Sequence, residues 1–308
     1  QEAVEYQHLG LIIIDEQHRF GVAQRHSLVK KAPPGKGLHQ LVMTATPIPR
    51  TLAMSAYGDL DHSLIDELPP GRKPINSVLL NNTKRAEVIE RIHLASNSGQ
   101  QVYWICPLIE ASEVLQCEAA QDTAALLTQQ LNNIKVGLVH GRLSGNEKAE
   151  VMAQFKAGYI QLLVATTVVE VGVDVPNANL MVIDNAERLG LAQLHQLRGR
   201  VGRGQAQSYC LFMYQAPLSA MGRERLDILR QSNDGFVIAE RDLQLRGPGE
   251  VLGTRQAGAV GLRIADLMRD AHLLPEVKVV AEGYISYLHK TEKIISRWVG
   301  ENQAFAKV

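Results

Sequence analysis

The chain has 308 residues, 45% of them hydrophobic, and its 32 basic and 32 acidic side chains give a formal net charge of zero. This length and composition suit about two folded domains and exclude a disordered chain. A zero net charge excludes any argument for nucleic-acid binding from global electrostatics, so such a surface must be local.

Three cysteines, at positions 106, 117 and 210, form no Cys-x-x-Cys pair. Their odd number argues against a disulfide framework or a zinc site. The first apolar run, residues 9–14, is far shorter than the roughly 20 residues of a membrane span, and no signal-peptide pattern precedes it. We therefore expect a reduced cytosolic protein with no membrane partner.

Short apolar segments alternate with longer amphipathic ones, a pattern typical of βαβ units and a mostly parallel sheet. The first block, residues 1–70, is expected to hold strands at 11–15 and 40–44, each buried on both faces, with a helix at 22–30 between them. Residues 68–74 contain three prolines and a glycine, so we expect a linker there.

The second block, residues 75–215, repeats the alternation and predicts a complete doubly wound domain with ligand loops at the carboxyl ends of its strands. A loop insertion is expected at 109–117. The expected strands are 102–106, 136–139, 161–165, 180–183 and 208–213, and the expected helices are 84–95, 119–131, 147–156 and 191–198.

From residue 216 to 308 the strands stop and helical spacing takes over. Turn residues 232–234 separate two expected helices, a Gly-rich loop follows, and two more helices complete the chain. The four expected helices cover residues 220–231, 236–245, 264–272 and 275–289, and the loop covers 249–261.

Asp15 and Glu16 end the first apolar run. Carboxylates at a strand end can hold Mg²⁺ through water, the role expected of Asp15, and polarise an attacking water, the role expected of Glu16. For a lone Asp-Glu pair, an ordinary acidic turn after a strand is the favoured interpretation. The extension Gln17-His18 and the arginine motif described below favour the nucleotide site.

Thr44 and Thr46 end the next strand, where hydroxyl groups can bond to the acidic loop and sense the γ-phosphate. Thr46 also fits a helix N-cap with Pro47 at the first helical position. His18 is a candidate partner across this gap, although a lone histidine also serves as an ordinary polar group.

The stretch from Gln196 to Arg203 places Arg198, Arg200 and Arg203 at close spacing with two glycines. Guanidinium groups arranged in this way are typical of a phosphate grip. Arg200 and Arg203 are expected to act on the transferring phosphate, where such arginines raise rates by about 10³ or more. A helix with surface salt bridges is the alternative, but each helical glycine costs about 1 kcal/mol.

A second set of candidates follows two strands of the second block. Thr166 and Thr167 offer hydroxyls and free backbone N–H groups that suit DNA phosphates. His140-Gly141 ends the preceding strand on the same rim and is a further candidate for a DNA backbone contact, with a plain turn as the alternative. Gly172 and Asp174 are expected to approach the nucleotide.

No Gly-x-x-x-x-Gly-Lys-Ser/Thr string occurs in the 308 residues, and the chain begins at Gln1. The loop that cradles the β- and γ-phosphates of a nucleoside triphosphate is therefore missing. We interpret the chain as the C-terminal part of a larger nucleic-acid motor.

These motifs resemble those of superfamily 2 helicases, and within them the RecG family of branched-DNA translocases. The strings that carry the resemblance are Asp-Glu-Gln-His-Arg-Phe-Gly-Val (15–22), Thr-Ala-Thr-Pro-Ile-Pro-Arg-Thr-Leu (44–52) and Gln-Leu-Arg-Gly-Arg-Val-Gly-Arg (196–203). The transcription-repair coupling translocase shares them. RNA helicases, which typically carry Asp-Glu-Ala-Asp and Ser-Ala-Thr, fit less well.

The stretches at 225–226, 232–236, 242–250 and 253–256 are similar to the translocation hairpin and loop of the same family. The resemblance implies that Arg225, Arg246 and Gln256 couple domain closure to movement of duplex DNA. Residues 263–267 resemble RecG more than the coupling translocase.

The resemblance implies an α/β fold of two RecA-like doubly wound parallel sheets, the first incomplete (1–70) and the second complete (75–215), followed by a helical hairpin module (216–308). It also implies ATP and Mg²⁺ as cofactors, remodelling of stalled forks and Holliday junctions, and a monomer at the nucleoid of the bacterial cytosol. The implied partners are branched and duplex DNA and single-stranded DNA-binding protein. A catalytically silent binding fragment or a transcription-repair coupling translocase is the alternative.

Overall fold

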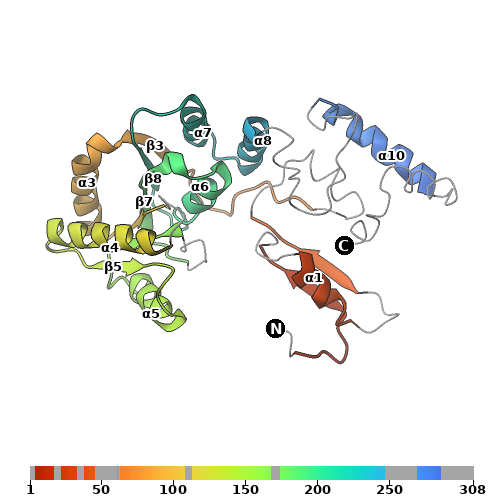
Figure 1. The fold of residues 1–308 in the computed structure, drawn as a ribbon, viewed down its shortest axis with the longest axis horizontal. Helices are drawn as coiled ribbons and strands as arrows, with labels where there is room; N and C mark the ends of the chain where they lie inside the picture. Colours follow the sequence, from red (N-terminus) through yellow and green to blue (C-terminus); the bar gives the residue numbers. More distant parts are fainter. Residues whose placement is uncertain are drawn as a thin grey trace. The chain divides into compact units, whose positions relative to one another are not determined.

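The computed structural model describes residues 4–16, 22–32, 38–45, 61, 63–107, 113–167, 174–246 and 269–285. The chain divides into two compact units, Ser63–Asp242 and a second made of Gln1–His62 with Leu243–Val308. Figure 1 shows the elements of each, coloured along the sequence. Among the described residues, no helix has the length and apolar character needed to cross a bilayer.

The N-terminal residues form a two-stranded parallel sheet from β1 (Leu11–Ile14) and β2 (His39–Val42), connected through α1 (Val22–Val29). Ile12 and Ile14 are buried, whereas Leu11 and Ile13 are about half exposed. The expectation that these strands are buried on both faces is therefore wrong for this chain. Side chains alternate between the two faces of a strand, so β1 is buried on one face only, and no residue of β2 is buried.

The other unit is built on a six-stranded, all-parallel sheet with strand order β3-β8-β7-β4-β6-β5. This arrangement confirms the predicted doubly wound α/β domain. The strands are β3 (Asn76–Asn81), β4 (Gln101–Ile105), β5 (Val136–Val139), β6 (Leu162–Ala165), β7 (Ala178–Ile183) and β8 (Tyr209–Tyr214).

Helices cover both faces of this sheet, so its central strands are apolar throughout. On one face, α3 (Arg85–Asn97) and α4 (Glu113–Gln130) pack over a core that includes Trp104. On the other, α5 (Gly145–Lys156), α6 (Leu191–Arg198) and α7 (Ala220–Gln231) pack over a core that includes Tyr103. Figure 1 shows α3 and α4 as neighbours and α6 close to α7.

Two elements differ from expectation. The strand β3 was not predicted, because polar residues at both ends leave it an apolar run of only three residues, and an edge strand needs fewer apolar residues. The helix α4 begins at Glu113, so the loop expected at 109–117 is wrong for residues 113–117. Residues 108–112 lie outside the described residues.

The two hairpin helices are confirmed as α7 and α8 (Gly235–Arg246). Leu226 and Leu229 of α7 are fully buried and belong to the core of the six-stranded domain, so packing continues across the expected boundary at 215/216. The division into three domains stays a prediction.

The remaining described elements are short or helical. Two 3₁₀ turns, η2 (Asn82–Lys84) and η4 (Ala186–Arg188), belong to the unit Ser63–Asp242. A third, η5 (Ala271–Leu273), leads into α10 (Leu274–Ile285), which confirms the start of the last expected helix. Residues 249–261, 264–268 and 286–289 lie outside the described residues.

Candidate functional site

The acidic motif lies where β1 ends, beside the end of β2. The Met43 N–H donates to the Ile14 carbonyl at 2.7 Å, which holds the two strand ends together. The Glu16 N–H donates to Asp15 Oδ1 at 2.9 Å, and the Ala45 N–H donates to Glu16 Oε2 at 3.5 Å. The structure therefore brings the Glu16 carboxylate to the segment that contains Thr44, as the sequence predicted.

Glu16 has a φ of 53°, in the left-handed region. This conformation is uncommon for residues other than glycine, and such strain concentrates at functional sites. It turns the backbone sharply straight after the strand and keeps the Glu16 side chain near the end of β2. Gln17, His18 and Thr46, which sequence analysis placed around this carboxylate, lie outside the described residues.

The donors at this strand end fit Mg²⁺. Asp15 is an exposed residue. Among the described residues, no group of three or more His, Cys, Asp or Glu could hold a metal ion. Mg²⁺ is usually held by one or two carboxylates while it keeps waters and phosphate oxygens. One exposed carboxylate at a strand end is sufficient for that kind of binding.

The arginine motif follows α6, whose C-cap is Gly199. Arg203 Nη1 lies 3.6 Å from Asp174 Oδ1, and Arg72 Nη2 donates to the Gly199 carbonyl at 3.3 Å. Burial, and next the charge of Arg203, lowers the pKa of Arg72. Burial raises the pKa of Tyr103 to about 12, and the positive charges of Arg203 and Arg200 oppose this rise.

These contacts define the arginine cluster: Arg72, Arg200, Arg203 and the acidic Asp174. The described contacts bring guanidinium groups together at this site, and guanidinium is the group best suited to bind phosphate. Sequence analysis predicted Asp174 and the two motif arginines. It missed Arg72, because that residue falls in the proline-rich linker and carried no other signal.

Glycine is needed at each of the two positions after Arg200, 202 and 204, for a different structural reason. Gly202 has a φ of +77°, a conformation that L side chains rarely adopt. Gly204 lies so close to Pro176 that an added Cβ would collide with its carbonyl oxygen. The backbone that carries Arg203 is thus fixed against the segment between Asp174 and β7.

Replacing Gly204 by alanine is expected to destabilise the six-stranded domain by about 1–3 kcal/mol, because backbone must move to admit the methyl group. Thermal unfolding of the chain should show this as a drop of about 2–4 °C per kcal/mol. Gly145→Ala is the control, since a Cβ there meets nothing within 4 Å. Equal melting temperatures for the two variants would contradict the close approach.

Arg198 does not share the position of the other two motif arginines. Arg198 is only 2% exposed, and its Nη1 donates to the carbonyls of Leu229 and Ser232 at 2.7 and 2.8 Å. The expectation that all three guanidinium groups serve as a phosphate grip is wrong for Arg198. The competing partners are main-chain carbonyls of a helix that local spacing could not reveal.

His195 lies one turn before Arg198 on α6, and its Nδ1 is 3.0 Å from Arg198 Nη2. Burial, and next the Arg198 charge, lowers the pKa of His195 to about 4. The neutral ring is therefore the folded form at pH 7. Its unprotonated Nδ1 can accept the hydrogen bond of the guanidinium.

The stability of the domain should fall as the pH drops from 6.5 to 4, because in that window the unfolded chain takes up a proton that the folded His195 does not. The loss attributable to His195 is up to roughly 3 kcal/mol. Guanidinium unfolding midpoints of wild type and His195→Gln measured at pH 7 and 4.5 check this. The variant should lose less stability on acidification, and an identical loss would contradict the assignment.

A second site lies at the carboxyl ends of β5 and β6, where Val139 pairs with Ala165. His140 and Thr166, which follow these strands, are 6% and 4% exposed. Within the described part of the chain, His140 Nδ1 and Thr166 Oγ1 are buried without a hydrogen-bond partner. Unsatisfied buried polar atoms are rare and need an explanation, such as a ligand.

The rim around this pair is basic. Lys148 Nζ donates to the Gly141 carbonyl at 2.8 Å. Burial lowers the pKa of His140, and the charges of Arg142 and Lys148 lower it further. Sequence analysis predicted His140, Gly141, Thr166 and Thr167, but missed Lys148, which lies seven residues from Gly141 and reaches it only through α5.

One detail of the predicted rim is wrong. The Thr166 N–H is not free, since it donates to the Val139 carbonyl at 3.1 Å, as expected where two parallel strands end together. Thr167 follows in a half-buried turn. Gly172, predicted near the nucleotide, lies outside the described residues.

Of the three predicted coupling residues, the structure describes the side chain of Arg225 alone. Arg225 on α7 donates to the carbonyls of Leu189 at 3.1 Å and Glu187 at 3.2 Å. Arg246 is the last residue of α8, and its side chain, like Gln256, lies outside what the structure describes. Gln196 is half-buried on α6.

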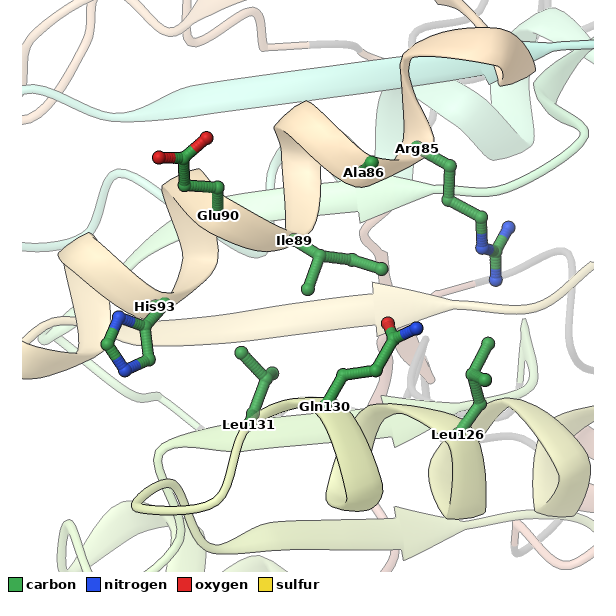
Figure 2. Close-up of a pocket in the computed structure, with 8 residues that line it drawn as sticks. All are labelled: Arg85, Ala86, Ile89, Glu90, His93, Leu126, Gln130 and Leu131. Atoms are coloured by element: carbon green, nitrogen blue, oxygen red, sulfur yellow. The ribbon is translucent and has the colours of Figure 1, made fainter.

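A cavity of about 620 Å³ lies between α3 and α4, on the other face of the sheet from α6. Figure 2 shows its lining, in which Ile89 and Leu131 face one another beneath polar side chains. Arg85 at its end is paired with Asp184 at 2.7 Å and lies 4.7 Å from the Trp104 ring centroid. No residue that sequence analysis selected lines this cavity.

Two family models match parts of this chain. A family model described as the helicase conserved C-terminal domain matches residues 84–205. A second, described as ATP-dependent DNA helicase RecG, domain 3, C-terminal, matches residues 232–296. The first contains the rim and the arginine motif, and the second begins at the turn between α7 and α8.

Individual relatives extend the likeness. The chain is 55% identical to the ATP-dependent DNA helicase RecG of Escherichia coli (strain K12), covering 99% of this chain and 45% of that protein. It is 50% identical to the protein of the same name from Thermotoga maritima, covering 89% of this chain and 35% of that protein. A solved structure of RecG bound to a three-way DNA junction matches with a TM-score of 0.66 and 46% identity, over 89% of this chain and 34% of that chain.

The chain thus spans less than half the length of the curated relatives it matches. Within that span, sequence identity, both matched models and the six-stranded parallel sheet agree. The chain belongs to the RecG family of superfamily 2 helicases.

Proposed function

We propose that this chain forms part of an ATP-dependent DNA helicase that translocates on duplex DNA and remodels branched DNA, including stalled forks and Holliday junctions. The observation that carries the proposal is the arginine cluster, in which Arg203 Nη1 lies 3.6 Å from Asp174 Oδ1 and the charge of Arg203 helps to lower the pKa of Arg72. Guanidinium groups gathered in this way are suited to the charge that develops on a transferring phosphate.

Each predicted residue takes a role that its chemistry permits. Arg200 and Arg203 stabilise the transferring phosphate, Gln196 supports them from α6, and Glu16 orients the attacking water. Thr44, at the end of β2 beside the Glu16 carboxylate, responds to the γ-phosphate. Asp15 would hold Mg²⁺ through water, and the ion would neutralise charge on the phosphate oxygens.

DNA contact is assigned to the rim of β5 and β6. The buried Thr166 hydroxyl and the His140 ring have unsatisfied polar atoms there, and Arg142 and Lys148 add positive charge beside them. Phosphate contacts of this kind position a duplex without reading its sequence. Gly141 and Thr167 flank the pair, and Gly172 and Asp174 complete the expected nucleotide side.

The proposal includes coupling and partners. Arg225, Arg246 and Gln256 link closure of the two RecA-like domains to steps along the duplex. The remaining expectations, a monomer that acts at the bacterial nucleoid with single-stranded DNA-binding protein as a partner, belong to the same proposal and follow from the family resemblance.

A second candidate function is a module that binds DNA without hydrolysing ATP. The sequence favours it for the isolated chain, because the 308 residues contain no phosphate-cradling loop. The acidic motif and the arginine cluster favour hydrolysis in a full-length RecG protein that contains this sequence, since a silent module has no use for them.

The test measures ATP hydrolysis with and without a three-way DNA junction, on the isolated chain and on a full-length RecG protein that contains it. We expect DNA-stimulated turnover only from the longer protein, and DNA binding from both. Turnover that DNA does not stimulate in the longer protein would overturn the helicase assignment. Turnover by the isolated chain would show that its site needs no further cradle.

A further inference from the structure

A buried cation links two helices of the six-stranded domain. Arg198, the last residue of α6, is 2% exposed, and a charge removed from water is tolerated only where hydrogen bonds satisfy it. Its Nη1 donates to the Leu229 and Ser232 carbonyls at 2.7 and 2.8 Å and approaches Ser77 Oγ at 3.3 Å, while Nη2 lies 3.0 Å from His195 Nδ1.

The acceptors are not arbitrary positions. Leu229 lies in the last turn of α7, and Ser232 is its C-cap. The last carbonyls of a helix have no partner within it and carry its negative dipole end. Arg198 therefore acts as a cationic cap on α7, supplied from the end of α6.

A second side chain links the middle of α7 to the segment before α6. Arg225 donates to the carbonyls of Glu187 and Leu189, which precede the first residue of α6. Leu194 and Leu197 of α6 and Leu226 and Leu229 of α7 are all fully buried in one core. With this apolar packing and the hydrogen bonds of Arg198 and Arg225, α6 and α7 are held as one body.

The tie at Arg198 has a particular position in the chain. One residue, the C-cap Gly199, separates it from Arg200, and α7 continues through residues 232–234 into α8. A displacement of α7 is thus passed to the backbone that carries the arginine cluster. An apolar side chain at position 198 would fill the space but would not fix the end of α6 against particular carbonyls of α7.

We propose that Arg198 is a positioning residue that makes ATP turnover respond to DNA, by fastening the arginine motif to the C-terminal end of α7. This inference rests on the proposed function, because it assumes that DNA acts on the α7–α8 hairpin and that Arg200 and Arg203 act on ATP. It assigns no direct contact with ATP or DNA to Arg198.

The readout is a ratio, the kcat for ATP hydrolysis with a three-way junction divided by the kcat without it, in a full-length RecG protein that contains this sequence. Substitutions along a coupling path change coupling by about 2- to 30-fold. We expect Arg198→Gln to lower the ratio by that order. Arg198→Lys should lower it less, because an ammonium keeps the charge but cannot reproduce the planar donor geometry.

Leu127→Ala is the matched control, because Leu127 is fully buried in the α4 core on the other face of the sheet. Removing it should lower the melting temperature, as should the loss of the buried hydrogen bonds of Arg198. Melting temperatures of all variants confirm that the comparison is fair. The control should leave the stimulation ratio within about twofold, since a purely structural loss does not act on coupling.

If both Arg198 variants keep the wild-type ratio while their melting temperatures fall like that of Leu127→Ala, Arg198 is only a stabilising residue and the inference is overturned. If Arg198→Gln does not fold, Arg198→Lys decides by the same criterion. A wild-type protein without DNA stimulation overturns the proposed function, and the inference with it.

Discussion

Replacing Arg203 by alanine, in a full-length RecG protein that contains this sequence, is expected to lower the kcat of DNA-stimulated ATP hydrolysis by about 10³-fold or more. The guanidinium lies in the arginine cluster, where its ion pair with Asp174 is long, at 3.6 Å, and its side chain is 32% exposed. A group held so loosely by its own chain can turn to a phosphate at little cost.

The same geometry predicts that the substitution hardly affects folding. An exposed ion pair contributes about 0–1 kcal/mol, so the melting temperature of Arg203→Ala should stay close to that of wild type. The effect should appear in kcat more than in KM for ATP, because interactions made only in the transition state raise kcat.

Arg91→Ala is the control for the loss of one positive charge. Arg91 is exposed on α3, which covers the other face of the sheet, so its removal should leave ATP turnover within about twofold, as for surface substitutions away from a site. An Arg203→Ala protein that hydrolyses ATP as fast as Arg91→Ala would remove Arg203 from the proposed site.

The strands of the six-stranded domain were predictable because parallel strands covered on both faces read as uninterrupted apolar runs. Tyr103, Trp104 and their neighbours on β4 are of this kind. The edge strand β3, with three polar residues, gives no such signal. The start of α4 was also missed, because residues 113–117 do not show apolar residues at clear helical spacing.

The candidate sites divide along similar lines. Residues that directly follow a predicted strand could be placed from topology alone, because neighbouring parallel strands end at one edge: Glu16 lies beside the end of β2, and Thr166 beside the end of β5. Arg198 could not, because its partners lie on α7 more than 30 residues away. Arg72 gave no local pattern either, and only the folded chain brings it to Gly199 and Arg203.

Glu16→Gln is expected to reduce ATP hydrolysis by the longer protein by about 10²- to 10⁴-fold, the usual contribution of a group that acts on a proton or water in the transition state. Glutamine matches glutamate in shape, and its amide oxygen can still accept the Ala45 N–H that now donates to Glu16 Oε2 at 3.5 Å. The strand end should therefore keep its conformation, so that the loss reports on the carboxylate alone.

Two measurements separate this role from a defect in binding or folding. The affinity for ATP, measured without turnover, should stay within a few fold, because the carboxylate acts on water rather than on the nucleotide. Glu118→Gln, at an exposed position on α4, should hydrolyse ATP like wild type. Undiminished DNA-stimulated turnover by Glu16→Gln would show that the water is oriented elsewhere, and the acidic motif would then be the turn that its bare sequence also allows.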